Sequence, residues 1–237
     1  MKAFAVKHPV IFELVLIVIA FILAIVFSFV GQVMYFPNDV NMAIGRILAA
    51  CLLFIVFIRC FQVKKQFSGF LMMLPALLFA IWNVFNHIVT NGEYGAVDYA
   101  IILGIAPALF EEVLFREIFI HNLKSSGQKP LATLLISALV FGAIHLTNIV
   151  GMAPAQVLVQ VGYSVVVGLV FGAIYIKSDD LISVVMAHAA IDITGKIFLS
   201  ASEATIPMLI AFVILLLGEA AYAFWLLLKD ENKAIGD

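Results

Sequence analysis

Hydrophobic residues occupy long stretches of this chain, and polar residues gather in short segments between them. A helix needs about 20 consecutive, mostly apolar residues to cross the hydrocarbon core of a bilayer. The pattern predicts such helices over residues 9–30, 40–61, 69–89, 98–120, 130–149, 156–176, 181–200 and 205–228. Because backbone groups in lipid must find partners internally, we predict an all-α fold, a polytopic transmembrane helical bundle of about eight helices. One membrane domain would span residues 1–237.

Composition agrees with this pattern. Of the 237 residues, 65% are hydrophobic and 12% are charged, and the mean hydropathy is +1.17. Soluble domains carry about 25% charged residues, so a soluble domain is excluded. The first apolar stretch is longer than that of a signal peptide, and we expect it to stay as a helix. A net charge of −2 without a basic tract gives no support for a nucleic-acid partner, and the expected partner is the lipid bilayer.

Ten of the thirteen basic residues fall at alternate ends of the predicted helices. They are Lys2, Lys7, Arg59, Lys64, Lys65, Lys124, Lys129, Lys177, Lys229 and Lys233. Basic residues near membrane spans favour the cytoplasmic side. The distribution therefore predicts a multi-pass protein with both termini in the cytoplasm. The remaining three, Arg46, Arg116 and Lys196, lie farther inside predicted helices.

The predicted helix 98–120 contains an unusual cluster of charges. Glu111, Glu112, Arg116 and Glu117 lie within eight residues, although a charge at the bilayer centre costs about 2.5–3.5 kcal/mol or more. Residues four apart lie on one helix face, so Glu112 and Arg116 are expected to form an ion pair. Glu111 points about 100° away and is expected to face a cavity. Glu117 is expected to reach the cytoplasmic interface.

Two later helices each add a histidine. Phe141 and His145 lie in the fifth predicted helix, and His188 and Asp192 lie one turn apart in the seventh. A rise of about 1.5 Å per residue places Glu111, His188 and Asp192 in roughly one layer, with His145 deeper. We therefore predict an aqueous site within the membrane. An interhelical hydrogen bond is the structural alternative for the pair of His188 and Asp192.

These residue types suit hydrolysis by an activated water. A carboxylate in a water-poor cavity can take a proton from water, while a histidine holds that water and other polar groups stabilise the oxyanion. No Gly-x-Ser-x-Gly motif or Cys–His pair offers a nucleophile. The same four side chains, Glu111, His145, His188 and Asp192, are also the candidate ligands of a zinc ion. The pattern leaves open whether the cofactor is Zn or none.

Three motifs in this order resemble a known family. Glu111-Glu112-x-x-x-Arg116, Phe141-x-x-x-His145 and His188-x-x-x-Asp192 are similar to the motifs of the CAAX-protease and bacteriocin-processing (CPBP, or Abi) intramembrane endopeptidases, which include the type II CAAX prenyl proteases. The resemblance covers residues 98–200, expected to be the catalytic-core helices.

The resemblance implies a site within the membrane that opens toward the cytoplasmic side. It implies Glu111 as general base and His145 as the residue that positions water, with His188 and Asp192 at an oxyanion or supporting position. Glu112, Arg116 and Phe141 are expected to support them. Members are described both as metalloproteases and as metal-free glutamic proteases. A membrane-associated protein or peptide is the expected substrate, in CAAX processing, bacteriocin maturation or self-immunity, and the short loops suggest a bacterial plasma membrane.

Three functions compete at this point. The first is an intramembrane endopeptidase. The second is a non-catalytic immunity factor or scaffold that uses the same polar cluster for packing and partner binding. The third is a proton- or ion-coupled transporter, because intramembrane carboxylates and histidines also form relays. No inverted repeat or pair of broken helices supports the transporter, and the endopeptidase is favoured.

Overall fold

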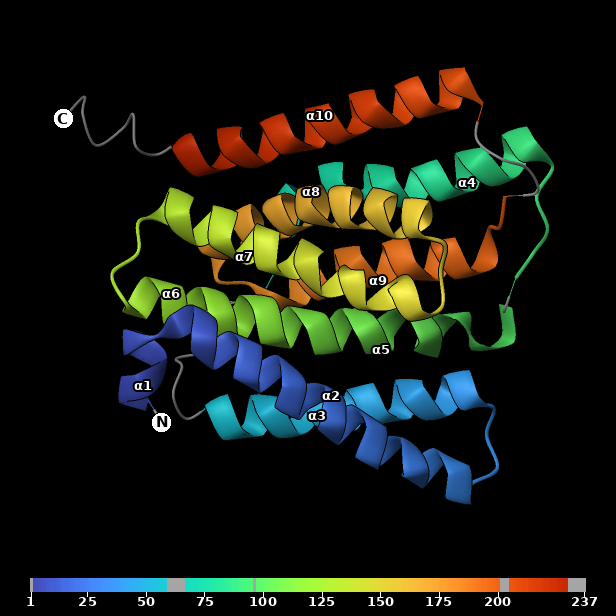
Figure 1. The fold of residues 1–237 in the computed structure, drawn as a ribbon. Coiled ribbons are helices and arrows are strands. Elements are labelled where there is room, and N and C mark those ends of the chain that lie inside the picture. Colours follow the sequence, from blue (N-terminus) through green and yellow to red (C-terminus); the bar gives the residue numbers. More distant parts are fainter. Residues whose placement is uncertain (1, 59–66, 96, 201–204, 230–237) are drawn as a thin grey trace.

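The fold is a bundle of helices, seen in a computed structural model that describes residues 2–58, 67–95, 97–200 and 205–229. The long helices run roughly parallel or antiparallel to one another and connect through short loops (Figure 1). Within the described residues, the β-structure consists of an isolated bridge between Tyr94 and Phe198. The predicted all-α class is confirmed.

Several long helices are joined by short turns, and some continue into 3-10 or π turns. In chain order the elements are α1 (Lys2–Lys7), α2 (Pro9–Val33), α3 (Asn38–Ile58), η1 (Leu71–Met73), η2 (Pro75–Leu77), α4 (Leu78–Thr90), η3 (Val97–Tyr99), α5 (Ala100–Glu112), η4 (Val113–Ile120), α6 (His121–Ser125), α7 (Pro130–Ile144), η5 (His145–Val150), α8 (Pro154–Ser178), α9 (Leu181–Ile197) and α10 (Ile206–Leu228).

Each of the eight predicted stretches corresponds to a helical segment. Five helical segments in the described residues are long and apolar enough to cross a membrane, namely Pro9–Val33, Asn38–Phe57, Pro130–Val150, Pro154–Ser178 and Ile206–Leu228. The other three stretches depart from a long regular helix. The third begins as 3-10 turns, the fourth changes from α5 to the π-helix η4, and α9 has 17 residues.

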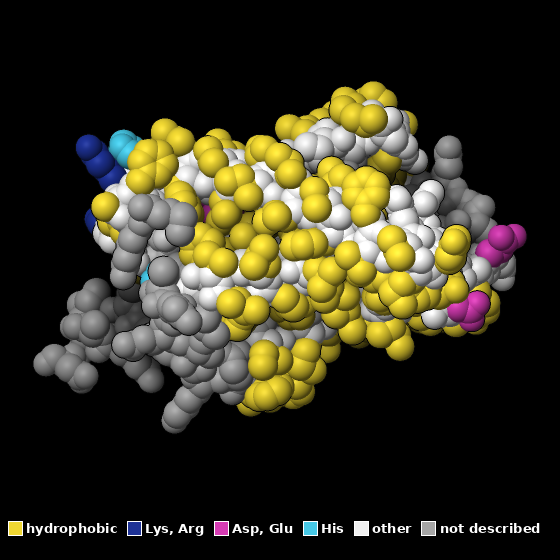
Figure 2. All heavy atoms as spheres, turned by 90° about the horizontal axis from the view of Figure 1, so that it is seen from below, with side chains coloured by type: hydrophobic (Ala, Val, Ile, Leu, Met, Phe, Trp, Pro, Cys, Tyr) yellow, Lys and Arg dark blue, Asp and Glu magenta, His cyan; other side chains and the backbone are white. Residues whose placement is uncertain are grey.

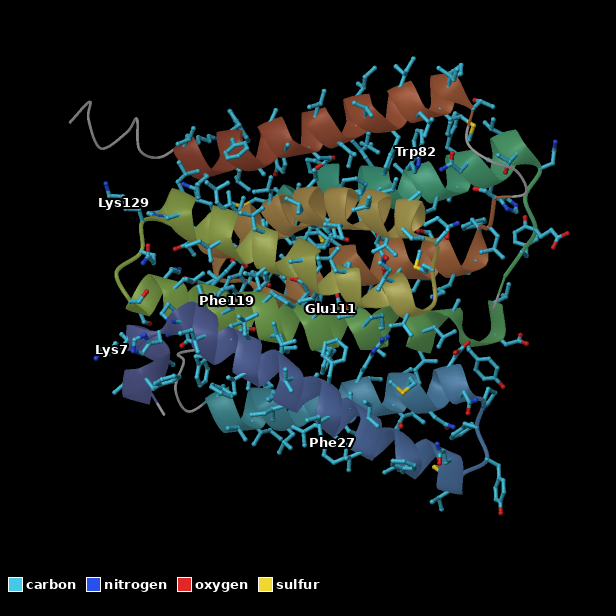
Figure 3. All side chains as sticks on the ribbon, in the orientation of Figure 1. Lys7, Phe27, Trp82, Glu111, Phe119 and Lys129 are labelled. Carbon is cyan, nitrogen blue, oxygen red and sulfur yellow. The ribbon has the colours of Figure 1, made fainter. Side chains whose placement is uncertain are left out.

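The two ends of the bundle differ in charge. Lys7, Lys124, Lys129, Lys177 and Lys229 lie at the end that holds α1, α6 and the end of α10, here called the lysine-rich end (Figures 1 and 3). The connections α2–α3, α4–α5, α7–α8 and α9–α10 form the opposite, lysine-poor end. Arg59, Lys64, Lys65 and Lys233, which also entered the orientation prediction, lie outside the described residues, as does the side chain of Lys2.

Hydrophobic side chains cover the surface between these ends. Figure 2 shows them across the middle of one face, with basic groups at one end and acidic groups at the other. Ile11 and Val18 of α2 and Ile210 and Leu217 of α10 are each more than half exposed. A large apolar surface of this kind marks contact with lipid, as a membrane bundle requires.

The π-helix η4 lies at the centre of the bundle. All eight of its residues are buried, and it contacts helices α2, α3, α7, α8 and α9. Glycines allow its neighbours to approach closely. A Cβ atom at Gly168 of α8 would lie 3.0 Å from the Cα of Ala138 on α7, and one at Gly104 of α5 would lie 2.8 Å from the backbone nitrogen of Ile193 on α9. These contacts fix α5, α7, α8 and α9 around a common interior.

Candidate active site

The junction between α5 and η4 holds a buried ion pair. Arg116 Nε lies 2.9 Å from Glu112 Oε2, and both side chains are fully buried. The predicted pairing of Glu112 with Arg116 is therefore present. Within the described residues the two terminal nitrogens of Arg116 have no hydrogen-bond partner, but the guanidinium lies 4.6 Å from the centre of the Phe141 ring. Attraction to the face of that ring lowers the cost of burying the charge.

The same glutamate holds His188 of α9. Glu112 Oε1 lies 2.8 Å from His188 Nδ1. A carboxylate oxygen can only accept, so Nδ1 donates and Nε2 is left for other partners. His188 Nε2 lies 3.9 Å from Glu111 Oε2 and 3.7 Å from Asp192 Oδ2. Arg116, Glu112 and His188 thus form a connected polar chain that ends at an imidazole edge between two further carboxylates.

Polar contacts at both ends of α9 fix its position. At its start, the carboxylate of Asp180 accepts hydrogen bonds from the backbone nitrogen and the hydroxyl of Ser183 and from the backbone nitrogen of Gly69. Farther along, Asn83 Nδ2 of α4 lies 3.0 Å from the carbonyl oxygen of Ile191. The bond at the helix start satisfies a backbone donor that the helix itself leaves free. The segment that carries His188 and Asp192 is therefore held from two sides.

His145 is oriented by a contact to the backbone. Helix α7 ends at Ile144, and His145 Nδ1 lies 3.0 Å from the carbonyl oxygen of Phe141. Because that oxygen accepts, Nδ1 donates and Nε2 is free to meet a ligand. The Phe141 ring packs against His145 with centroids 5.3 Å apart and against His188 at 6.2 Å. Phe141 is therefore a shared wall for both imidazoles and for Arg116.

These residues surround a cavity of about 470 Å³. Glu111, His145, His188 and Asp192 all line it, as does Phe141. Figure 3 places Glu111 near the middle of the bundle, well away from Lys7 and Lys129. The Glu111 side chain is 17% exposed and that of Asp192 is 26% exposed, so both remain reachable for water. His145 was expected to lie deeper than Glu111, His188 and Asp192. It still shares their cavity, because the cavity extends toward the C-terminal end of α7.

The cavity extends toward the lysine-poor end. Its lining includes the first turns of α3, the η5 turn, the first half of α8 and the last turns of α9, and the chain connections at that end of the bundle adjoin all of these (Figure 1). Two expectations from the sequence therefore conflict. If the lysine-rich end is cytoplasmic, the cavity opens on the opposite side of the membrane, and not toward the cytoplasm as the resemblance implied.

The structure adds contacts that the sequence did not reveal. The bond between Glu112 and His188 joins residues 76 positions apart, and no local spacing predicts it. The expectation for Glu117 was wrong, because its side chain does not reach the interface. Glu117 is 7% exposed, and its Oε2 accepts a hydrogen bond of 2.7 Å from the Tyr175 hydroxyl. Burying an acceptor without a donor costs free energy, and Tyr175 of α8 supplies the donor for Glu117.

The alternative of a zinc site gains no support from the arrangement. Within the described residues, no group of three or more His, Cys, Asp or Glu side chains is placed so that it could hold a metal ion. His188 Nδ1 is already bound to Glu112, which leaves one nitrogen for any ligand.

Comparison with known proteins gives one finding. Residues 93–194 match the family described as type II CAAX prenyl endopeptidase, Rce1-like. The matched segment contains Glu111, Glu112, Arg116, Phe141, His145, His188 and Asp192. No curated protein and no solved structure matches the chain.

Proposed function

Because residues 93–194 belong to the Rce1-like family of type II CAAX prenyl endopeptidases, we propose that this membrane protein hydrolyses peptide bonds within the bilayer by a water that Glu111 activates. The match confirms the resemblance inferred from the three motifs. Protease activity in general follows from the family. The roles of individual residues and the class of substrate are the subject of the proposal.

The proposed hydrolysis rests mainly on how Glu111 and His188 are placed. Glu111 and the Nε2 edge of His188 face one cavity, 3.9 Å apart, and His145 and Asp192 line the same space. A separation above about 3.5 Å between two polar groups suits a water molecule as their bridge. The cavity volume of about 470 Å³ falls in the range of about 300–1,000 Å³ typical of pockets that enclose small ligands. A short peptide segment and a water fit there together.

The reaction follows from this placement. Glu111 removes a proton from the bound water as the water oxygen attacks the carbonyl carbon of the substrate. His145, held at Nδ1 by the Phe141 carbonyl, orients the water through Nε2. The carbonyl oxygen gains negative charge, and His188 in its doubly protonated imidazolium form has an Nε2–H that can donate to it while Nδ1–H stays on Glu112. Glu111 then passes its proton to the departing amide nitrogen, and the carbon–nitrogen bond breaks.

Glu112 and Arg116 support this chemistry and take no proton. Glu112 binds both Arg116 and His188, and a carboxylate at Nδ1 holds the proton there and fixes the ring orientation, which leaves Nε2 directed at the cavity. The substrate is a membrane-associated protein or peptide. The name of the matched family refers to prenylated CAAX proteins, and processing of such proteins or of a bacteriocin-like peptide both suit this site.

The test compares cells that carry the wild type, Glu111→Gln or Glu93→Gln. Glu93 is exposed in the α4–α5 connection, so its variant is a matched carboxylate-to-amide control. We expect Glu111→Gln to remove every new protein terminus that the wild type generates in the membrane fraction, while Glu93→Gln keeps them. Both variants should unfold at the wild-type temperature in detergent. If no terminus depends on Glu111, the site is a scaffold or immunity element and the proposal fails.

A further inference from the structure

Two basic residues stand apart from the charge distribution of the bundle. In the described part of the chain, the basic residues lie at the lysine-rich end or, for Arg116, in the buried pair with Glu112. Arg46 and Lys196 are the exceptions. Arg46 lies in the apolar helix α3 and Lys196 in the last turn of α9, both in the half of the bundle nearer the lysine-poor end (Figure 1).

Both exceptions line the cavity that holds Glu111. They approach it from different helices, and the charges of both act on the carboxylate of Asp192. Neither side chain forms an ion pair or a hydrogen bond within the described residues. A charged residue inside a membrane helix is costly and usually pairs with another group or lines a functional path. Arg116 has a carboxylate at 2.9 Å, whereas no carboxylate of the described residues lies within ion-pair distance of Arg46.

We propose that Arg46 and Lys196 form a binding subsite for a carboxylate of the peptide substrate. The proposal rests on the proposed function and adds the substrate chemistry. The guanidinium of Arg46 offers a planar pair of donors that matches a carboxylate, and Lys196 adds a point charge. The carboxylate is either the C-terminus of the substrate or an acidic side chain close to the bond that is cut.

Electrostatics also orients the bound peptide. Glu111 repels an anionic group from its own part of the cavity, while Arg46 and Lys196 attract it at the side nearer the lysine-poor end. The peptide bond to be cut then lies at Glu111, and the carboxylate lies within the length of one small cavity from it. The subsite therefore selects peptides with a negative charge within a few residues of the cleaved bond.

The test measures binding without cleavage, in Glu111→Gln protein purified in detergent. The probes are an N-acetylated pentapeptide of Ala and Leu with a free C-terminal carboxylate, its C-terminal amide, and the same amide with one Leu replaced by Glu. We expect the free acid or the Glu peptide to bind about tenfold more tightly than the neutral amide, equivalent to about 1.4 kcal/mol. The tighter of the two identifies the source of the carboxylate.

The variants assign the effect to the subsite. Arg46→Gln should weaken binding of the anionic peptide about tenfold and change binding of the neutral amide less than about twofold. Lys196→Gln should act in the same direction, and Lys129→Gln, at the exposed lysine-rich end, should change neither. Thermal unfolding verifies that each variant is folded.

Equal binding of all three peptides, or no binding of any, overturns the subsite. An equal loss for acid and amide in Arg46→Gln also overturns it, because the arginine would then act through the fold. Since the terminus comparison with Glu111→Gln reports cleavage separately, failure of the subsite leaves the proposed protease activity standing. If no protein terminus depends on Glu111, the proposed protease activity is rejected, whatever the peptides show.

Discussion

At the scale of residues, the pair of Glu112 and Arg116 decides whether the site can form. Both side chains are fully buried, and a buried charge that loses its partner destabilises a protein by about 3–5 kcal/mol. Arg116→Met should therefore lower the free energy of unfolding, measured by denaturant titration in detergent, by about that amount. Lys124→Met is the control, since it breaks the partly exposed pair with Asp179, and such pairs contribute about 0–1 kcal/mol.

A double variant separates stability from positioning. Glu112→Leu combined with Arg116→Met removes both charges, and apolar replacement of a whole buried pair is often neutral for stability. We expect the double variant to regain most of the lost stability. Cleavage should stay lost, because His188 no longer has an acceptor at Nδ1. If Arg116→Met costs no more than Lys124→Met, the buried pair does not have the structural role described.

The four side chains that the sequence placed in one site do line one cavity, but the sequence did not predict several of the bonds that hold the surrounding residues. Spacing alone predicted that Arg116 pairs with Glu112 and that Glu111 faces the cavity. A charge in lipid needs a partner or a polar surrounding, and the helical period determines which residues share a face. Spacing could not assign Glu112 to His188 or Glu117 to Tyr175. Those bonds depend on how α5, η4, α8 and α9 approach one another, and no local period carries that information.

At the scale of elements, the contact between α7 and α8 sets the position of Phe141. A Cβ atom at Gly168 would lie 3.0 Å from the Cα of Ala138 and 3.2 Å from the Phe141 ring. Gly168→Leu should therefore push the helices apart at the wall shared by both imidazoles. Inserting bulk into a close-packed interior costs about 1–3 kcal/mol.

The measurement is the unfolding temperature in detergent together with cleavage by the same preparation. Gly162→Leu is the matched control on the same helix, since a Cβ atom at Gly162 meets nothing within 4 Å. We expect Gly168→Leu to lose both stability and cleavage while Gly162→Leu keeps both. Wild-type behaviour of Gly168→Leu would show that the separation of α7 and α8 does not control the site.

The elements also show where hydropathy stops being informative. It located a helical segment in each of the eight stretches, because hydropathy depends on composition over about 20 residues, and five of these segments in the described residues are long and apolar enough to cross a membrane. It did not predict the π-helix Val113–Ile120 or the 3-10 turns at Leu71–Leu77. A change in hydrogen-bond register leaves composition unchanged, so it depends on the packing around the segment. Short π segments are often found at functional sites, and this one directly follows Glu112.

At the scale of the whole molecule, the direction of the cavity determines the side of the membrane from which Glu111 can be reached. The distribution of lysines predicts that the lysine-rich end is cytoplasmic, and the cavity extends the other way. The lysine distribution is a property of this chain, whereas a cytoplasmic opening is implied by the resemblance alone. Substrate would then enter from the non-cytoplasmic side of the membrane.

Cysteine labelling on intact cells tests this orientation. In a protein with Cys51 and Cys60 replaced by Ser, Thr147→Cys places a thiol at an exposed position that lines the cavity. Gln128→Cys places one at the exposed lysine-rich end. A membrane-impermeant maleimide should label Thr147→Cys in intact cells and label Gln128→Cys only after the cells are broken. The reverse result would put the cavity on the cytoplasmic side, and the peptides drawn to Arg46 and Lys196 would then have to be cytoplasmic.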